Sequence, residues 1–198
     1  VFTAGDGDLW RSIGTSAGTT LLSDNQGTRG QGSNPKVPVE VGGNLYFTAF
    51  DGNYLPTLWK TGGPGTTPTA LSAGFRYPGP ANLVNAGGTL FFAANNGDSG
   101  VELWRSDGTS AGTQLVRDIS TGSPGSAPSA IVNGGGTLYF VADDGASGRE
   151  LWKSDGTTAG TVLVRDIATE LDASGKPSSA NPAELTWGGG WLWFTADD

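Results

Sequence analysis

The chain has no cysteine, no histidine and no methionine among its 198 residues. The lack of cysteine excludes disulfides and thiolate metal ligands. The lack of histidine excludes imidazole ligands, Ser–His nucleophiles and a histidine pH switch. With so little of the usual catalytic chemistry present, we expect a protein that is not an enzyme and that holds no cofactor. The missing initiator methionine leads us to expect a trimmed or processed chain.

Positive charge and long apolar runs are also scarce. The chain has 11 Lys and Arg against 19 Asp and Glu, which gives a net charge of −8, and the basic residues are dispersed. An excess of negative charge opposes binding to a phosphate backbone or to an anionic bilayer surface. No apolar run is long enough for a transmembrane helix, and none has the pattern of a signal peptide. We therefore expect neither nucleic-acid binding nor membrane insertion.

One segment, Glu150–Ile167, is repeated along the chain and reads ELWKSDGTTAGTVLVRDI. A copy at Glu102–Ile119 differs at three positions, a more altered copy begins at Asp8, and a fourth covers Thr57–Ala73. The repeated tryptophans, 49, 45 and 48 residues apart, are Trp10, Trp59, Trp104 and Trp152. A period of this length is typical of propellers, solenoids and arrays.

Each repeat is expected to contain four short strands. An apolar strand precedes each Trp segment, and the complete examples are Leu45–Ala49, Leu90–Ala94, Leu138–Ala142 and Leu192–Ala196. Further upstream, a Pro-led strand ends in glycines that form a hairpin turn. The 34 glycines and 11 prolines stand between apolar runs, which indicates turns and not disorder, and no segment has helical periodicity.

This pattern predicts an all-β fold, namely a β-propeller of four-stranded antiparallel blades. We expect about four repeats of 45–50 residues in one domain or segment over residues 1–198, with repeat boundaries near 36, 80, 128 and 181. A β-sandwich or a β-helix fits less well. Pairing of the Pro182–Asp198 hairpin with the Leu9–Ser23 strands would close a four-bladed ring, with one second strand redundant. That redundancy favours the alternatives, namely a window of a longer repeat array with more blades, or rings formed between chains.

The repeated residues are expected to build the scaffold. A tryptophan at the same place in every repeat indicates a core anchor between neighbouring blades, whereas stacking on a sugar would require exposed rings. The Ser-Asp-Gly-Thr segments at Ser106–Thr109 and Ser154–Thr157 predict tight turns. The flanking residues Glu102, Arg105, Glu150 and Lys153 are expected to be solvated or paired on the blade face.

A second acidic turn occurs at corresponding places in two repeats, and its carboxylates belong to Asp98, Asp143 and Asp144. Their oxygens are of the kind that calcium uses, but the spacing of an EF-hand loop and its bidentate Glu are missing. We expect an ordinary turn with no metal, and keep calcium as the alternative.

The segments Glu102–Thr109 and Glu150–Thr157 match the signature of the bacterial ELWxxDGT-repeat proteins, and the downstream Ala-Gly-Thr-x-Leu-Val-Arg-Asp-Ile also resembles that family. The match is partial in the first repeat and poor in the second, where only Leu58 and Trp59 remain. The resemblance implies a large secreted or cell-surface protein with propeller-like repeats. It implies no defined activity.

Departures from the repeat are the better candidates for function. The second repeat carries extra aromatic and Arg residues of the types that favour recognition, and the C-terminal end carries extra tryptophans. The candidates for ligand or partner binding are Phe50, Tyr54, Phe75, Arg76, Tyr77, Trp187 and Trp191. The alternatives are that these side chains fill a gap between blades, contact a neighbouring chain or cover an open edge.

The function favoured by these residues is a non-catalytic extracellular module that binds a glycan or a protein. The first alternative is a structural subunit of an extracellular assembly that associates with itself. The second is a glycoside hydrolase, which needs unique carboxylates. The non-repeated acids are Asp6, Glu40, Glu170, Asp172 and Glu184, and none lies in a recognisable catalytic motif.

Overall fold

The computed structural model describes residues 2–3, 9–12, 14–23, 35–51, 53–62, 66–71 and 74–198. Every regular element in this part of the chain is a β-strand. Consistent with this, the described ranges contain no helix that is long and apolar enough to cross a membrane. The prediction of an all-β fold is confirmed.

The strands form antiparallel meanders that follow one another along the chain. Sheet I contains β1 (Phe2–Thr3), β2 (Leu9–Arg11) and β3 (Thr20–Ser23). Sheet II contains β4 (Lys36–Val41), β5 (Asn44–Phe50), β6 (Pro56–Thr61) and β7 (Thr69–Leu71). Sheet III contains β8 (Arg76–Ala86), β9 (Thr89–Asn95), β10 (Val101–Ser106) and β11 (Gln114–Arg117). Sheet IV contains β12 (Ser129–Gly134), β13 (Thr137–Asp143), β14 (Arg149–Ser154) and β15 (Val162–Arg165), and sheet V contains β16 (Ala183–Gly188) and β17 (Trp191–Thr195).

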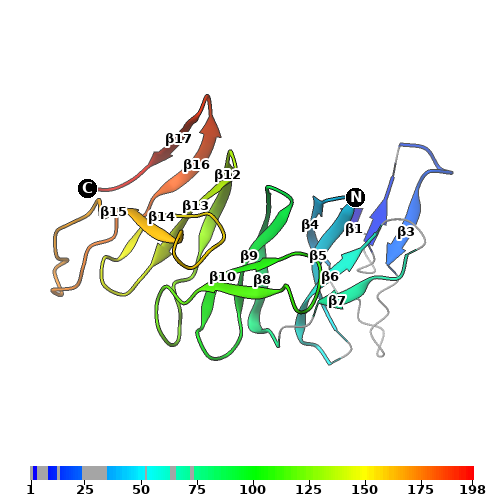
Figure 1. Cartoon of the computed structure of the whole chain (residues 1–198), viewed down its shortest axis with the longest axis horizontal. Helices are drawn as coiled ribbons and strands as arrows, with labels where there is room; N and C mark the ends of the chain where they lie inside the picture. The colour runs from blue at the N-terminus through cyan, green and yellow to red at the C-terminus, as the bar shows by residue number, and fades with distance from the viewer. Residues whose placement is uncertain are drawn as a thin grey trace.

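The sheets form an open row. The first strands of consecutive sheets, β4, β8, β12 and β16, contact one another in that order. Figure 1 shows that β1 and β17 lie at opposite ends of the row. These first strands begin at residues 36, 76, 129 and 183, close to the expected repeat boundaries.

Pairing of the C-terminal hairpin with the N-terminal strands, which was one of the arrangements left open by the sequence, is not observed within the described residues. Within the described residues, β16 and β17 pair only with each other. The physical reason is that sheets II to V each pack on the next sheet in sequence, and Figure 1 shows sheet I at the other end of the row from sheet V.

Both faces of the central sheets are buried. On β9, Phe91 packs towards sheet IV, and the next residue, Phe92, packs towards sheet II. Successive side chains of a strand point to opposite faces, so a strand that is apolar at both odd and even positions needs a cover on each side. The apolar runs that identified these strands in the sequence therefore also determine how the sheets stack.

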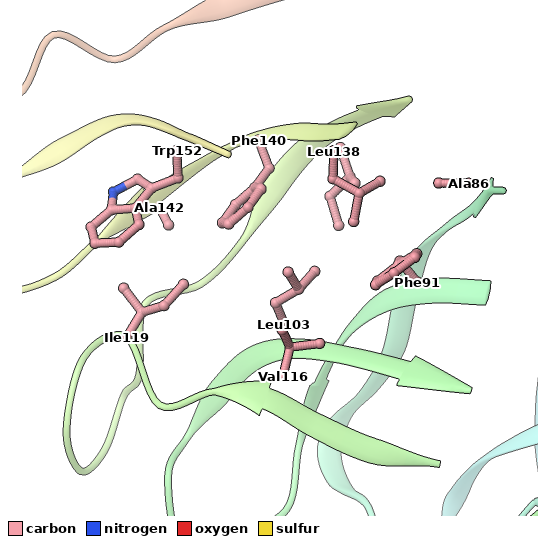
Figure 2. Packing of buried hydrophobic residues seen from close by; sticks show 10 residues of the cluster. Ala86, Phe91, Leu103, Val116, Ile119, Leu138, Phe140, Ala142 and Trp152 are labelled. Atoms are coloured by element: carbon pink, nitrogen blue, oxygen red, sulfur yellow. The ribbon is translucent and has the colours of Figure 1, made fainter. Parts of the chain in front are cut away.

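The interface between sheets III and IV is a layer of interlocking apolar side chains (Figure 2). Trp152, Phe140 and Leu138 point from sheet IV towards Phe91 and Leu103 of sheet III. The exposed fraction of Phe140 is 0% and that of Trp152 is 4%. Such packing removes a large apolar area from water and is the main favourable term in folding.

The four repeated tryptophans are not equally buried. Trp104 and Trp152 belong to the core, whereas Trp59 and Trp10 are half-buried. Trp59 lies on the face of sheet II that is directed away from sheet III, with Phe47 beside it. The core role predicted from the sequence therefore applies best to Trp104 and Trp152, which lie in the two copies of the segment that are most alike.

A polar ladder links the hairpin turns of consecutive sheets. Asn85 donates an amide hydrogen to the Glu40 carbonyl at 2.9 Å, and Asn133 donates to the Asn85 carbonyl at 3.1 Å. Each Asn also accepts a backbone N–H from its own turn. In sheet V the corresponding residue is Trp187, whose ring stacks on Tyr139 with the centroids 5.7 Å apart. The ladder therefore fixes the register between sheets and ends where Trp187 replaces asparagine.

We expect Trp152→Ala to lower the free energy of unfolding by about 3–5 kcal/mol, because the ring leaves a cavity between sheets III and IV. Urea denaturation followed by circular dichroism measures the change. Trp191→Ala is the matched control, since that ring is 71% exposed and its removal should change stability by about 0.5 kcal/mol or less. Equal effects of the two substitutions would contradict the core role of Trp152.

Candidate functional site

A pocket of about 430 Å³ lies between sheets II and III. Strands β4, β5 and β6 of sheet II contribute one side, and residues 77–83 of β8 contribute the other. The lining residues are mainly apolar, aromatic or proline, and they are Lys36, Thr48, Ala49, Phe50, Pro56, Tyr77, Pro78, Gly79, Pro80, Ala81, Asn82 and Leu83. A concave site with an apolar lining and a few polar groups is the usual form of a binding pocket.

The pocket exists because β8 is longer than its counterparts. It has 11 residues, whereas β12 and β16 have six each, and the extra residues include Pro78 and Pro80. Proline has a fixed φ and no backbone donor, so this part of the strand is stiff and has few ladder bonds to make. The Asn95 amide donates to the Tyr77 carbonyl at 2.9 Å and holds the extension against β9.

The two sides of the pocket meet at Gly79 and Pro56. A side chain at Gly79 would overlap the Pro56 ring, so glycine is required for the close approach of the two segments. Tyr77, with an exposed fraction of 81%, stands at the rim. The result is a preformed pocket with a large ring available for contact.

The pocket contains one charged side chain, Lys36, and no acidic one. Its other polar side chains are Thr48 and Asn82, and the Asn82 amide already donates to the Pro128 carbonyl at 3.3 Å. The lining therefore offers apolar surface, aromatic faces and a single cation. It suits an apolar or aromatic group, with room for a negative charge beside the lysine.

The structure separates the residues that the sequence proposed for binding. Phe50 and Tyr77 line the pocket, whereas Tyr54 and Arg76 are exposed but outside its lining. Phe75 is not a surface residue. Its exposed fraction is 4%, and its ring packs edge-on against Phe92 and Trp104, with centroids 5.8 Å and 5.2 Å away.

Phe75 is therefore a correction to the proposed binding set. Phe75 fits the alternative interpretation, in which side chains of this segment fill a gap between sheets. The reason is that Phe75 lies directly before β8, where its ring packs beside Trp104 in the core between sheets II and III. Composition alone does not distinguish an aromatic that plugs a gap from one that faces solvent.

The C-terminal tryptophans belong to a different place in the row. Trp187 of sheet V is half-buried, with its ring stacked on Tyr139 of sheet IV, while the exposed fractions of Trp191 and Trp193 are 71% and 65%. They lie on sheet V, and the pocket lies between sheets II and III. The two groups of aromatic candidates are thus two separate surfaces.

The acidic turns have the geometry of ordinary Asx turns. Asp144 accepts N–H bonds from Ala146 and Ser147, and Asp143 accepts one from Gly145. Asp98 is exposed in the corresponding turn of sheet III. Within the described residues, no three acidic side chains are placed to share a metal ion. The carboxylates of Asp143 and Asp144 serve the backbone of their own turn, and in sheet III the Asn95 and Asn96 side chains take that part.

The non-repeated acids do not converge on one site. Glu40, at the end of β4, accepts the Gly43 N–H at 2.6 Å, and Glu184 lies on β16, so β8 and β12 separate the two strands. Glu170 and Asp172 are exposed in the segment between β15 and β16. A hydrogen bond from the Ser174 hydroxyl is the main cause that lowers the pKa of Asp172. Asp6 lies outside the described residues.

The sequence analysis misplaced the two glutamates of the repeated segment. Glu102 and Glu150 are completely buried, not solvated. Glu102 Oε1 accepts the backbone N–H groups of Ser120 and Ser126 at 3.0 Å and 2.8 Å, and its Oε2 accepts the Ser126 hydroxyl. The alternation of side chains along a strand could have predicted this burial, because Glu102 is two residues before Trp104 and lies on the same buried face.

Glu150 plays the same part in sheet IV. Its Oε1 accepts the Ala180 N–H at 2.9 Å, and its Oε2 accepts the Ile167 N–H at 3.2 Å. Each carboxylate therefore holds the long loop that leads from the last strand of its sheet to the next sheet. Burial raises the pKa of Glu102, although its hydrogen bonds act in the opposite direction.

Buried carboxylates often mark catalytic sites, but Glu102 and Glu150 are enclosed by the backbone of their own loops and repeat from sheet to sheet. The Ser-Asp-Gly-Thr turns are confirmed in both copies. Asp107 accepts the Thr109 hydroxyl at 2.7 Å and its N–H at 2.8 Å, and these bonds lower the pKa of Asp107. These repeated acids are structural.

The fold and the pocket define a class of protein: an all-β repeat protein of stacked antiparallel sheets with a binding-type pocket between two of them. No family model matches the chain, and no curated protein matches it. The solved structures that resemble it include AtxE2 isopeptidase in its apo form, at a TM-score of 0.52 and 12% identity. The match covers 85% of this chain and 25% of that one, so the chain spans about a quarter of the isopeptidase's length. At this identity the likeness concerns the fold alone.

We expect Glu102→Gln to stabilise the protein progressively, relative to the natural chain, as the pH rises from acid to neutral. The folded-state pKa of Glu102 is raised, so the natural chain loses stability as the pH rises from the ordinary glutamate pKa to that raised value. Glutamine keeps the acceptor oxygen and has no charge to bury.

The measurement is the free energy of unfolding in urea at several pH values for both chains. Taking the difference between them cancels the titration of exposed acids such as Asp107. Glu184→Gln is the matched control, because this side chain is exposed. A difference between the Glu102 variant and the natural chain that does not change with pH would contradict the assignment.

Proposed function

We propose that the protein is a non-catalytic extracellular interaction module whose pocket between sheets II and III binds an apolar or aromatic side chain of a protein partner. The observation that supports this proposal is the pocket's lining, in which Phe50, Tyr77 and three prolines surround one lysine. Exposed aromatic rings in a preformed concave site are the usual anchors of protein recognition.

A protein partner fits this lining better than a glycan. Sugars are held by many directed hydrogen bonds, whereas the polar side chains of this pocket are Lys36, Thr48 and Asn82, and Asn82 is already engaged. An extended peptide needs only one or two side chains that fill the apolar space. An acidic residue next to the inserted side chain would gain from Lys36.

We further propose that the sheets are propeller-type blades and that the chain is related to the ELWxxDGT-repeat proteins of the bacterial surface. The support is the repeated segment, the contact of first strand with first strand, and the packing of each blade on the next. A secreted or cell-surface location follows from that relationship, and the net charge of −8 agrees with a module that avoids phosphate and anionic lipid.

A displayed library of linear peptides is the experiment that tests the pocket. We expect the selected peptides to share an aromatic or large apolar residue, and Tyr77→Ala or Phe50→Ala to weaken their binding about tenfold or more by calorimetry. Tyr54→Ala is the matched control, since Tyr54 is 54% exposed and lies outside the pocket lining.

Selection of no peptide, or an equal loss with the Tyr54 variant, would refute the proposal. Binding on a glycan array that depends on Tyr77 would replace the protein partner by a sugar.

A second candidate is the β-sheet portion of a larger peptide-cleaving enzyme, favoured by the likeness to part of an isopeptidase. Incubation of the chain with an isopeptide-linked peptide, followed by mass spectrometry, separates the two candidates. Cleavage that is lost in an acid variant such as Glu40→Gln would support the enzyme. Binding without cleavage supports the interaction module.

A further inference from the structure

The pocket can be compared with the equivalent places in sheets III and IV, because the first and second strands of each sheet pair in the same way. The pair next to the register shift of the first strand is Lys36–Thr48 in sheet II, Ala81–Ala93 in sheet III and Ser129–Val141 in sheet IV. Sheet II thus carries a cation and a hydroxyl where sheet III carries two alanines. Both of these polar side chains line the pocket.

The aromatic lining of the pocket differs from the other sheets in the same way. Phe50 is at the end of β5, and the residues at this place in sheets III and IV are Asn95 and Asp143. Asn95 and Asp143 each accept a backbone N–H from their own turn, whereas Phe50 lines the pocket. The polar and the aromatic lining therefore belong to sheet II and not to sheets III and IV.

Lys36 has a positive charge that the fold does not use. Lys60 and Arg105 each donate to a turn carbonyl of the next sheet, at 3.3 Å and 3.2 Å. The Lys36 side chain is exposed, and no group among the described residues accepts a hydrogen bond from it or forms an ion pair with it. Because the pocket lining contains no acidic side chain, this charge favours a ligand with a negatively charged group.

The polar and the aromatic lining lie on the same face of β5. Thr48 and Phe50 are two residues apart on this strand, and Tyr46, two residues before Thr48, packs in the core between sheets II and III. All three side chains therefore belong to the face that is directed towards sheet III. A strand rises about 3.3 Å per residue, so the two parts of the lining are separated by about 6–7 Å. An extended peptide has the same period, and its side chains two positions apart match that separation.

We propose that the pocket recognises an extended segment of a partner protein that carries a large apolar or aromatic residue and, two positions away, an aspartate or a glutamate. This inference rests on the proposed function and adds the position and the charge of a second residue to it. The apolar side chain lies between Phe50 and Tyr77, and the carboxylate accepts hydrogen bonds from the Lys36 ammonium and the Thr48 hydroxyl. Neighbouring residues of an extended segment point to opposite sides, so an acid directly beside the apolar residue does not reach Lys36.

Synthetic peptides test the spacing. Each is an acetylated and amidated heptapeptide of glycine and serine with phenylalanine at its third position, and NMR titration of the natural chain measures its affinity. Glutamate at the first or the fifth position should raise the affinity about fivefold over glutamine at the same position, as expected for one ion pair near the surface. Glutamate at the fourth position should give no gain. Peptides selected from the displayed library should likewise carry an acid two positions from their shared apolar residue.

Variants of the chain test the two groups that bind the carboxylate. Lys36→Gln should reduce the gain from glutamate to about twofold or less, and Lys36→Glu should make the peptide with lysine at that position the tighter ligand. Thr48→Val removes the hydroxyl and should reduce the gain to a smaller extent. Lys153→Gln is the matched control, because this lysine is also exposed and lies in sheet IV, outside the pocket lining. Circular dichroism verifies that each variant is folded.

The outcomes separate this inference from the proposed function. Binding that is lost in Tyr77→Ala but is equal for the glutamate and glutamine peptides would overturn the inference and leave the proposed function in place. An equal gain from glutamate at the fourth position would overturn the spacing, and an equal gain from a peptide that ends at phenylalanine with a free carboxylate would assign the charge to a chain terminus. An equal loss of the gain in Lys36→Gln and Lys153→Gln would overturn the inference by reducing the gain to overall charge. A chain that binds none of the synthetic or displayed peptides would refute both proposals.

Discussion

The structure depends on one constraint: no sheet can cover its own two apolar faces. Phe91 and Phe92 are neighbours in sequence, yet each is buried against a different sheet. A meander with both faces apolar is stable only between two others, because exposed apolar area on either side costs free energy in proportion to its size. Stacking of sheets II, III and IV in a row follows from this requirement.

Polar groups give this apolar stacking its register. Hydrophobic burial has no direction, so it does not by itself determine how one sheet is placed along the next. The asparagine ladder, the bonds from Lys60 and Arg105 to turn carbonyls, and the buried Glu102 and Glu150 provide the direction. Because a buried carboxylate must find donors, each glutamate also determines the path of the loop that enters the next sheet.

Much of the fold could be predicted because the same pattern of strands and turns occurs several times in the sequence. The strand order, the turns at Asp107 and Asp155 and the boundaries between sheets follow from local patterns that recur at one spacing. The candidate site was only partly predictable. Phe50 and Tyr77 were among the proposed residues, but Lys36, Thr48 and Asn82 line the pocket without any sequence signal of their own. The proximity of Lys36 and Thr48 to Asn82 depends on the contact between sheets II and III, which a single sequence does not encode locally.

The same limit explains why Phe75 and Glu102 were misassigned in opposite directions. A residue type predicts exposure only on average, and burial here is determined by what the neighbouring sheet leaves uncovered. Directly before β8, an aromatic ring fills the gap between sheets, and where a loop offers N–H groups, a carboxylate is buried. The departures from the repeat therefore have two different consequences. Departures at an interface fill gaps between the stacked sheets. Departures at the rim of an interface, such as the proline-rich half of β8, create a pocket surface.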